Sequence, residues 1–576
     1  MLDTARAEDP PGVAYKVAFD GAIEKPLAKR LRALSQSEAL RKRPPPTVGL
    51  LRRRADADVE RFVEALRSYG YYAATVSVAV DESEVPVVLQ FTVDPGPAYV
   101  VRSVAVAYTD PIEEPGVALV PTVKVGEVFA AADIPPARDA LRRALRCHGF
   151  PRPTIADQQI RVEHSDQSVH IVWTIDRGPS GVFGETVFEG TERTEYAWLQ
   201  REVPWKRGDT YDIRRVEAFR DALTAANLFT SIQIDTAVRE GTTTPLPVDL
   251  LVVLREGPPR TVQTGLGYNS DEGPYVSGSW EHRNYLGQAE LFRFDTRLSL
   301  EAIEGGVEFR KPGFRRRNQD LILSLRAARE DFDPYVSETV RLAAGVERRL
   351  TSLWTLRLDS AFRFANITQD DEREQFALVS FPAALVRDSR DSRLHPTSGS
   401  RWSVELEPTT DLAGSKTAYL KGITELRVYR QIADDPEWLV AGRFRIGSIS
   451  AADHDSVPAD DRFYAGGGSS IRGYGFQEVG PYDGATNIGG LSFIELSAEL
   501  RWKITERYGA VAFVDAGNAY LERYPDLAEP LQIGAGLGFR YYTPFGPIRL
   551  DVAVPVNPDS DRHGPFQFYV SIGQAF

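Results

Sequence analysis

From Pro258 to the last residue, the chain is a long succession of segments in which apolar and polar side chains alternate. Gly, Asn, Asp and Pro separate these segments, and no helical pattern interrupts them. Because successive side chains of a strand point to opposite faces, the alternation predicts strands with one apolar and one polar face. Segments of about ten residues in such a series are typical of a transmembrane β-barrel.

A soluble β-sandwich also alternates and is the competing interpretation. The number of segments argues against it, as do the aromatic residues at segment ends: Trp280, Tyr285, Trp402 and Trp502. Tyr and Trp gather at the two interfaces between a membrane and water. An even number of strands places both barrel ends on the same side of the membrane. We expect sixteen antiparallel strands, near 262–270, 275–285, 289–303, 305–312, 320–331, 335–348, 352–366, 373–388, 400–411, 414–430, 436–449, 487–503, 508–516, 531–541, 547–555 and 566–576.

The last predicted strand, FQFYVSIGQAF, shows the alternation most clearly. Its even-numbered residues are expected to face lipid: Phe566, Phe568, Val570, Ile572 and Phe576. Its odd-numbered residues, including Tyr569 and Gly573, are expected to face the lumen. In the first strand, Gly265 and Gly267 also face the lumen. These glycines are expected to weaken packing beside the seam between the first and last strands.

The first half of the chain repeats one small unit three times. Three helical stretches align, at 62–72, 139–150 and 218–229. Each unit opens with a strand, continues with helices and two strands, and ends at a Gly-Pro pair. The sequence thus predicts three α+β domains, at 1–98, 99–180 and 181–258, before a barrel at 259–576. Each is expected to expose a sheet edge that accepts a strand from another chain; the alternative is that the domains are spacers.

Composition excludes several classes of function. A formal net charge of −13 argues against a nucleic-acid partner. The single cysteine, Cys147, rules out an intramolecular disulfide or a thiol-based metal site and is expected to be a core residue. Seven scattered histidines, without HExxH or GxSxG, give no catalytic constellation, so no enzyme, cofactor or metal is expected. The first residues, MLDTARAEDP, lack a secretory signal, so an exported chain is expected to have lost it already.

A glycine-rich loop, AGGGSSIRGYGF at 465–476, carries the residue of most interest, Arg472. Alternation places Glu499 and Asp515 on the inner faces of two later strands. Two carboxylates so close need a cation, and the planar guanidinium of Arg472 can serve both. The alternative is that Arg472 is solvated and Glu499 pairs with Arg501. A phosphate-binding loop is not expected, because neither Lys-Ser, Lys-Thr nor a helix follows the glycines.

Two motifs carry a resemblance to a known family. IRGYG, with Ile471, Arg472, Gly473 and Tyr474, resembles the (V/I)RG(F/Y) loop motif of the BamA-type superfamily. FVDAG, with Phe513, Asp515 and Gly517, resembles its FxDxG strand motif. The repeated units resemble POTRA domains, and three of them before sixteen strands are similar to the TamA family, the outer-membrane subunit of the translocation and assembly module. BamA would bring five units, and two-partner-secretion transporters two with a plug helix.

The resemblance implies a bacterial outer-membrane insertase with its POTRA domains in the periplasm. Its clients would be unfolded barrel proteins such as autotransporters, and its barrel would be monomeric and contact membrane lipid or lipopolysaccharide. A lid loop at about 450–486 would fold into the lumen, and the seam marked by Gly265, Gly267, Gly573 and Phe576 would open sideways. The implied partner is a TamB-like inner-membrane-anchored protein, docked on the first POTRA domain. The alternatives are a two-partner-secretion transporter or pore, and a lipid-transport partner of TamB.

Overall fold

The computed structural model describes residues 12–21, 23–109, 119–239, 244–269, 271, 273–370, 372–413, 417–434, 436–543, 546–559 and 562–572. The chain divides into two compact units. The first comprises Met1–Glu189, Val203–Ala222 and Ile232–Val253, and the second comprises Gly190–Glu202, Leu223–Ser231 and Leu254–Phe576. No helix among the described residues is long and apolar enough to cross a membrane.

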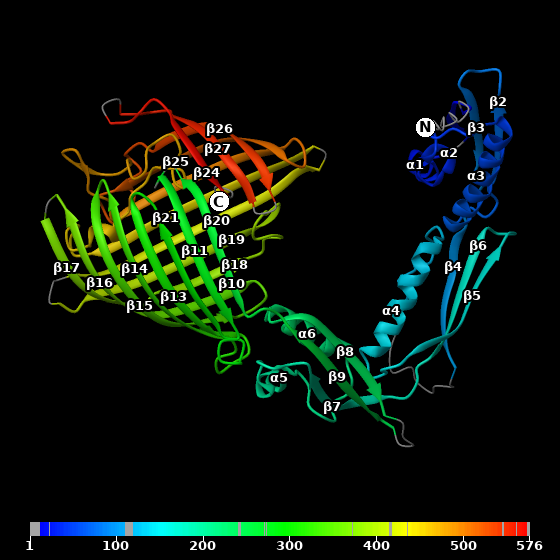
Figure 1. The fold of residues 1–576 in the computed structure, drawn as a ribbon, viewed down its shortest axis with the longest axis horizontal. Coiled ribbons are helices and arrows are strands. Elements are labelled where there is room, and N and C mark those ends of the chain that lie inside the picture. The colour runs from blue at the N-terminus through cyan, green and yellow to red at the C-terminus, as the bar shows by residue number, and fades with distance from the viewer. Residues whose placement is uncertain are drawn as a thin grey trace, which may run out of the picture. The chain divides into compact units, whose positions relative to one another are not determined.

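Three small sheets follow one another in the first half of the chain, and each has its last strand in the middle (Figure 1). The middle strand runs parallel to the first strand of its domain and, in the first two domains, antiparallel to the second. The first domain contains β1 (Tyr15–Asp20), α1 (Lys25–Leu34), α2 (Gln36–Ala39), α3 (Val48–Ser68), β2 (Thr75–Asp81) and β3 (Val87–Asp94). The second contains β4 (Val100–Tyr108), α4 (Ile134–Arg146), β5 (Thr154–Glu163) and β6 (Ser168–Asp176). The third contains β7 (Gly181–Glu189), α5 (Tyr196–Glu202), α6 (Ile213–Ala225), β8 (Phe229–Val238) and β9 (Leu246–Glu256).

Helix α3 shows how these domains are built. Thr47 caps its start by accepting a hydrogen bond from the Leu50 N–H. Its buried residues recur at helical spacing, so that one face is apolar: Leu51, Ala55, Phe62 and Leu66. That face packs against the sheet, where the Phe62 ring centroid lies 5.1 Å from that of Phe91 on β3. The predicted order of strand, helices, strand and strand is thus what the structure contains.

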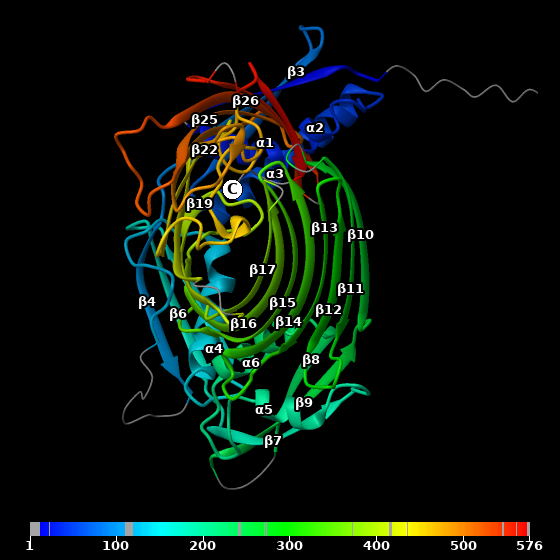
Figure 2. The same cartoon turned by 90° about the vertical axis from the view of Figure 1, so that its left-hand side faces the viewer.

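The second half of the chain is one antiparallel sheet that curves into a barrel (Figures 1 and 2). Its elements are β10 (Arg260–Asn269), β11 (Gly273–Arg283), β12 (Leu291–Leu298), β13 (Ala302–Lys311), β14 (Gln319–Phe332), β15 (Tyr335–Arg349), β16 (Trp354–Gln369), β17 (Glu372–Ser380), β18 (Ala383–Asp388), β19 (Ser398–Asp411), β20 (Ala418–Asp434), β21 (Glu437–Ala451), β24 (Ser492–Lys503), β25 (Tyr508–Tyr520), β26 (Gln532–Thr543), β27 (Gly546–Pro555) and β28 (Gln567–Ile572). Both β17 and β18 pair with β16 and with β19, so they are two parts of one wall strand. Pro382, which lacks an N–H, lies at the break between them. The prediction of POTRA-like domains followed by a sixteen-stranded antiparallel barrel is confirmed.

Side chains alternate across the barrel wall as the sequence predicts. On β10, Val262 is 70% exposed and Leu266 is 79% exposed, as expected for residues that face lipid. On β28, Phe568 is exposed, whereas its neighbour Tyr569 is buried. The predicted seam residues Gly573 and Phe576 lie outside the described residues.

The sheet order begins with β10 and ends with β28, and these two strands lie next to each other. Between their described residues, 260–269 and 567–572, no strand pairing is formed. Every other pair of neighbouring wall strands is joined by a ladder. The seam is therefore the place where the described wall lacks main-chain hydrogen bonds.

The connection between β21 and β24, residues 452–491, is called the lid here. It contains a short helical turn, η2 (Ala459–Asp461), and a small hairpin of β22 (Tyr482–Asp483) and β23 (Thr486–Asn487). Figure 2 looks along the barrel, where this yellow-orange segment lies inside the ring of strands. The lid is longer than the 450–486 predicted for it, because residues 487–491 belong to it and β24 begins only at Ser492.

The lid has an apolar core that it shares with the wall. Lid residues and residues of β20, β21, β24 and β25 form one buried cluster: Tyr419, Ile449, Ala451, Val457, Phe463, Ala465, Ile471, Tyr474, Val479, Leu491, Phe493 and Ala519. Burying side chains of this kind stabilises a fold by about 1.5–3 kcal/mol each relative to exposure. The lid is thus a packed element of the fold.

Candidate functional site

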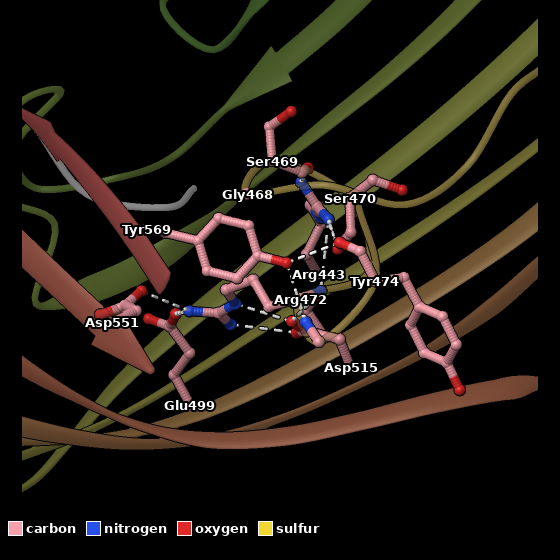
Figure 3. A network of polar contacts seen from close by, with 12 residues as sticks. Arg443, Gly468, Ser469, Ser470, Arg472, Tyr474, Glu499, Asp515, Asp551 and Tyr569 are labelled. Atoms are coloured by element: carbon pink, nitrogen blue, oxygen red, sulfur yellow. Dashed lines mark hydrogen bonds and ion pairs between the residues drawn. The ribbon is translucent and has the colours of Figure 1, made fainter. Parts of the chain in front are cut away.

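Arg472, in the middle of the lid, binds three carboxylates at once (Figure 3). Its Nε lies 2.6 Å from Asp515 Oδ2, and its Nη2 lies 3.0 Å from Asp515 Oδ1. Its Nη1 lies 2.7 Å from Glu499 Oε1 and 3.1 Å from Asp551 Oδ2. The backbone N–H of Arg472 also donates to Asp515 Oδ2, at 3.1 Å. Only 2% of the Arg472 side chain is exposed, so this fork-to-carboxylate geometry is shielded from water.

Three further arginines also contact these carboxylates. Arg501 donates from Nε to Glu499 Oε2 at 2.8 Å. Arg540 donates to Asp551, and Arg549 Nε lies 3.6 Å from the same carboxylate. Glu499 therefore contacts both Arg472 and Arg501, one through each oxygen. The pairing of Glu499 with Arg501 thus occurs beside the contact with Arg472, whereas the alternative of a solvated Arg472 is wrong. Buried charges are tolerated only when they are paired in this way, so removing any one leaves its partner uncompensated.

Phe513 lies under the Arg472 guanidinium. The guanidinium carbon is 3.5 Å from the centre of the Phe513 ring, which is a cation–π contact. Phe513 and Asp515 are two positions apart on β25 and both face the lumen. The Phe513 ring stacks on the guanidinium, and the Asp515 carboxylate accepts hydrogen bonds from it. A lysine at position 472 could not reproduce this combination of a planar fork and a stacked face.

Close backbone approach explains three glycines of the site. Gly473 has φ +107°, and a Cβ there would lie 2.9 Å from the carbonyl oxygen of Val554. On β26, a Cβ at Gly534 would lie only 1.7 Å from the carbonyl oxygen of Arg472. The flanking residues Ile471 and Tyr474 are fully buried, and the Tyr474 hydroxyl lies 3.0 Å from Gln532 Oε1. Gly517, the last residue of the strand motif, would meet Ile494 O at 2.5 Å if it carried a Cβ.

Arginines of the wall bind the carbonyl groups of the turn at 468–470. Arg443 donates from Nη1 to Ser469 O at 2.7 Å and from Nη2 to Ser470 O at 3.2 Å. Arg549 donates from Nη2 to Gly468 O at 3.1 Å. Carboxylates of the wall thus bind the side chain of Arg472, and arginines of the wall bind the backbone of the lid at 468–470.

A second set of charges holds the lid on another arc of the wall. Asp460 and Asp461, in η2, both contact Arg363 of β16. Asp460 Oδ2 also accepts from the Ser337 hydroxyl at 2.8 Å, and Lys421 donates to Asp461 O at 2.7 Å. Burial raises the pKa of Asp460 above its usual value. Here the carboxylates belong to the lid and the cation to the wall, the reverse of the Arg472 cluster.

Sequence reasoning named Arg472, Glu499 and Asp515 but missed several of their neighbours. Asp551 and Arg549 are two positions apart on β27 and share its inner face, so the alternation in IRLDV could have predicted both as lumenal residues. The contacts of Asp460 and Asp461 with Arg363 have no such signal in the sequence, because neither periodicity nor spacing predicts them. One seam glycine, Gly267, differs from expectation, because a Cβ there would lie 2.4 Å from Cζ of Tyr275. That ring covers Gly267, so the edge is packed there rather than weakened.

Comparison with known proteins identifies the family. The Omp85 superfamily domain matches residues 284–576, which contain the barrel from its third strand, β12, onward. The chain belongs to the Omp85 superfamily. Residues 18–95 match the POTRA domain described as TamA domain 1, and residues 182–257 match the POTRA family described as surface antigen variable number repeat. As an Omp85 protein, the chain is an outer-membrane β-barrel protein with its POTRA domains in the periplasm.

Other Omp85 proteins resemble the chain over most of its length. The outer membrane protein assembly factor BamA of Nitratidesulfovibrio vulgaris is 26% identical over 554 residues, covering 90% of this chain and 68% of that protein. The outer membrane protein assembly factor BamA of Neisseria meningitidis serogroup B is 20% identical over 588 residues, covering 89% and 72%. The crystal structure of Haemophilus ducreyi BamA lacking POTRA domains 1–3 has a TM-score of 0.67 at 18% identity, covering 78% of this chain and 95% of that one. The last similarity concerns the Omp85 fold alone.

Proposed function

We propose that this protein is an outer-membrane protein assembly factor that releases its clients sideways, through the seam between β10 and β28. The observation that carries the proposal is the contrast between a filled lumen and an unpaired seam. The lid occupies the lumen with an apolar core, the buried ion pairs of Arg472 and the largely buried ion pairs of Arg363. The seam, by contrast, has no strand pairing between its described residues.

The energies of the two routes support lateral release over an axial pore. Opening the lumen along its axis would break the Arg472 cluster, and disrupting a buried ion pair costs about 3–5 kcal/mol. Parting β10 from β28 breaks no ladder among the described residues, whereas a wall hydrogen bond contributes about 0.5–1.5 kcal/mol. The exposed main-chain edges of β10 and β28 would then be available to a strand of the client. The name of the two BamA relatives, assembly factor, agrees with this activity.

We further propose the TamA type within the superfamily. The match of residues 18–95 to TamA domain 1 supports it. The first POTRA domain would then be the docking site for a TamB-like inner-membrane-anchored partner. Side chains of β2, an edge strand of that sheet, alternate between exposed and half-buried, which suits addition of a strand from a partner. Autotransporters are the proposed clients, and lipid supplied by the partner is the competing cargo.

A reversible crosslink across the seam tests the proposal. One cysteine is placed within 262–268 of β10 and one within 567–571 of β28, in the full chain carrying Cys147→Ser. A matched pair across the ladder of β14 and β15, such as Leu323→Cys with Ala344→Cys, controls for the chemistry, because these residues face each other in a closed part of the wall. Loss of client assembly on oxidation of the seam pair alone, restored by reductant, is the expected result. Full assembly with the seam crosslinked would mean that clients leave by another route, as in a pore.

A further inference from the structure

Gly468 of the lid lies between the two ends of the barrel sheet. Its backbone N–H donates to Asp271 Oδ1 at 2.8 Å, and Asp271 lies in the turn that joins β10 to β11. A Cβ at Gly468 would lie 3.0 Å from Cδ1 of Tyr569, a residue of β28. The same Cβ would lie 3.4 Å from Asp271 Oδ1, so only a residue without a side chain fits this gap comfortably.

Tyr569 binds the backbone of the lid arginine motif through a single oxygen. Its hydroxyl accepts from the Gly473 N–H at 2.9 Å and donates to the Tyr474 carbonyl oxygen at 2.6 Å (Figure 3). The hydroxyl thus uses its proton and a lone pair on the backbone of two adjacent residues. Tyr569 is 2% exposed, so water cannot easily replace either bond. The last strand is therefore held to the lid by two hydrogen bonds.

The segment between these two attachment points is rigidly held. Arg472 lies between Gly468 and Gly473, and its guanidinium is bound by Asp515, Glu499 and Asp551. Arg443 holds the carbonyl groups of Ser469 and Ser470. These contacts hold the two attachment points at fixed positions relative to each other.

We propose that residues 468–474 of the lid form a latch across the seam. Asp271 fastens the first hairpin to one end of the latch, and Tyr569 fastens the last strand to the other. The described residues of β10 and β28 are not paired with each other, so the latch supplies the polar connection that their ladder lacks. The seam parts when either fastening is released. The latch concerns the barrel itself, and testing it requires neither a client nor the proposed assembly function.

The test measures the width of the seam in the purified full chain, in lipid nanodiscs and with Cys147→Ser. Spin labels are attached at Leu266→Cys and Phe568→Cys, which are 79% and 51% exposed, so the labels avoid the lumen. Electron–electron distance measurement then reports the separation of β10 and β28. Tyr569→Phe removes the hydroxyl and keeps the ring. We expect the population of wider separations to rise by about 5- to 30-fold, as the loss of two hydrogen bonds implies.

The matched control is Tyr520→Phe. Tyr520 is also 2% exposed and lies on β25, but its hydroxyl has no hydrogen-bond partner among the described residues. This variant should leave the distance distribution unchanged. A Tyr569→Phe distribution identical to that of Tyr520→Phe would overturn the latch.

A second variant separates a latch from two independent contacts. Asp271→Ala releases the other fastening from a turn outside the wall, so the barrel remains folded even where a change in the lumen is not tolerated. The latch closes the seam only while both fastenings hold, so releasing the second fastening adds nothing once the first is released. The double variant Asp271→Ala/Tyr569→Phe should therefore widen the seam no more than the stronger single variant. Additive effects would overturn the proposal. Asp526→Ala is the control, because that carboxylate caps its own turn in the β25–β26 loop by accepting from the Ala528 N–H.

Discussion

Arg363 of β16 and Asp461 of the lid form a largely buried ion pair whose polarity is opposite to that of the pairs made by Arg472. Near the start of the lid, at η2, the wall supplies the cation, and in the middle of the lid Arg472 supplies it. The contacts of Arg363 and the contacts of Arg472 are the two anchors of the lid. Adding charge of one sign to the lid therefore cannot strengthen both anchors. Each anchor can be weakened separately, which makes their roles distinguishable by experiment.

Replacing Arg363 by Ala should destabilise the barrel by about 3–5 kcal/mol, because two carboxylates of the lid lose a buried partner. The free energy of unfolding, followed by the heat-induced shift of the barrel on gels, is the measurement. Arg373→Ala is the control, since the Arg373 side chain is 59% exposed and lies 3.7 Å from Glu338. That change should stay within about 0.5 kcal/mol. Equal effects of the two variants would show that the Arg363 anchor contributes nothing specific.

Arg472→Lys should fail to restore what Arg472→Ala removes. A lysine keeps the charge but loses the bidentate contact with Asp515 and the stacking on Phe513. Client assembly should fall in both variants while the barrel still inserts into the membrane. The double variant Arg472→Ala/Asp515→Ala should be less destabilised than the sum of its single changes, because it leaves one fewer unpaired carboxylate. Wild-type assembly by Arg472→Lys would refute the geometric argument.

Gly534→Ala should displace the lid without changing any charge. The new Cβ would overlap the Arg472 carbonyl oxygen, at 1.7 Å. Protease digestion at the lid should therefore become faster, in purified protein and in whole membranes alike. Gly442→Ala is the matched change in the wall, because the nearest atom to its Cβ, Ser497 O, is 3.9 Å away. Equal protection of the lid in both variants would contradict the close approach.

Phe62→Ala should unfold the first POTRA domain selectively. Phe62 is fully buried on α3, and truncating a buried Phe costs about 3–5 kcal/mol. Binding of the proposed TamB-like partner should be lost in a pull-down, while the barrel keeps its heat resistance. Leu50→Ala on the same helix is the control, since Leu50 is 45% exposed. Retained binding by a domain shown to be unfolded would move the docking site elsewhere.

Alternation explains why the barrel and half of the site could be predicted. A period of two assigns Glu499 and Asp515 to the inner face without knowledge of their partners, and their shared charge calls for a cation nearby. The path of the lid follows no period, because its main chain is folded by contacts with the wall. Asp461 and Arg363 are 98 residues apart, and the contact depends on where that path runs. Tyr569 was expected to face the lumen, but its bonds to Gly473 and Tyr474 exist only once the sheet has closed around the lid.

From the apolar core of the lid we also expect an order of events during folding. Its residues pack against Tyr419, Ile449, Phe493 and Ala519, which belong to β20, β21, β24 and β25. These strands flank the lid in the sequence, so their contacts close shorter loops than any contact between β10 and β28. We expect these four strands to condense around the lid first, with the other strands of the wall joining later. The barrel would then be assembled around its own plug, and the seam would be the last part of the wall to form.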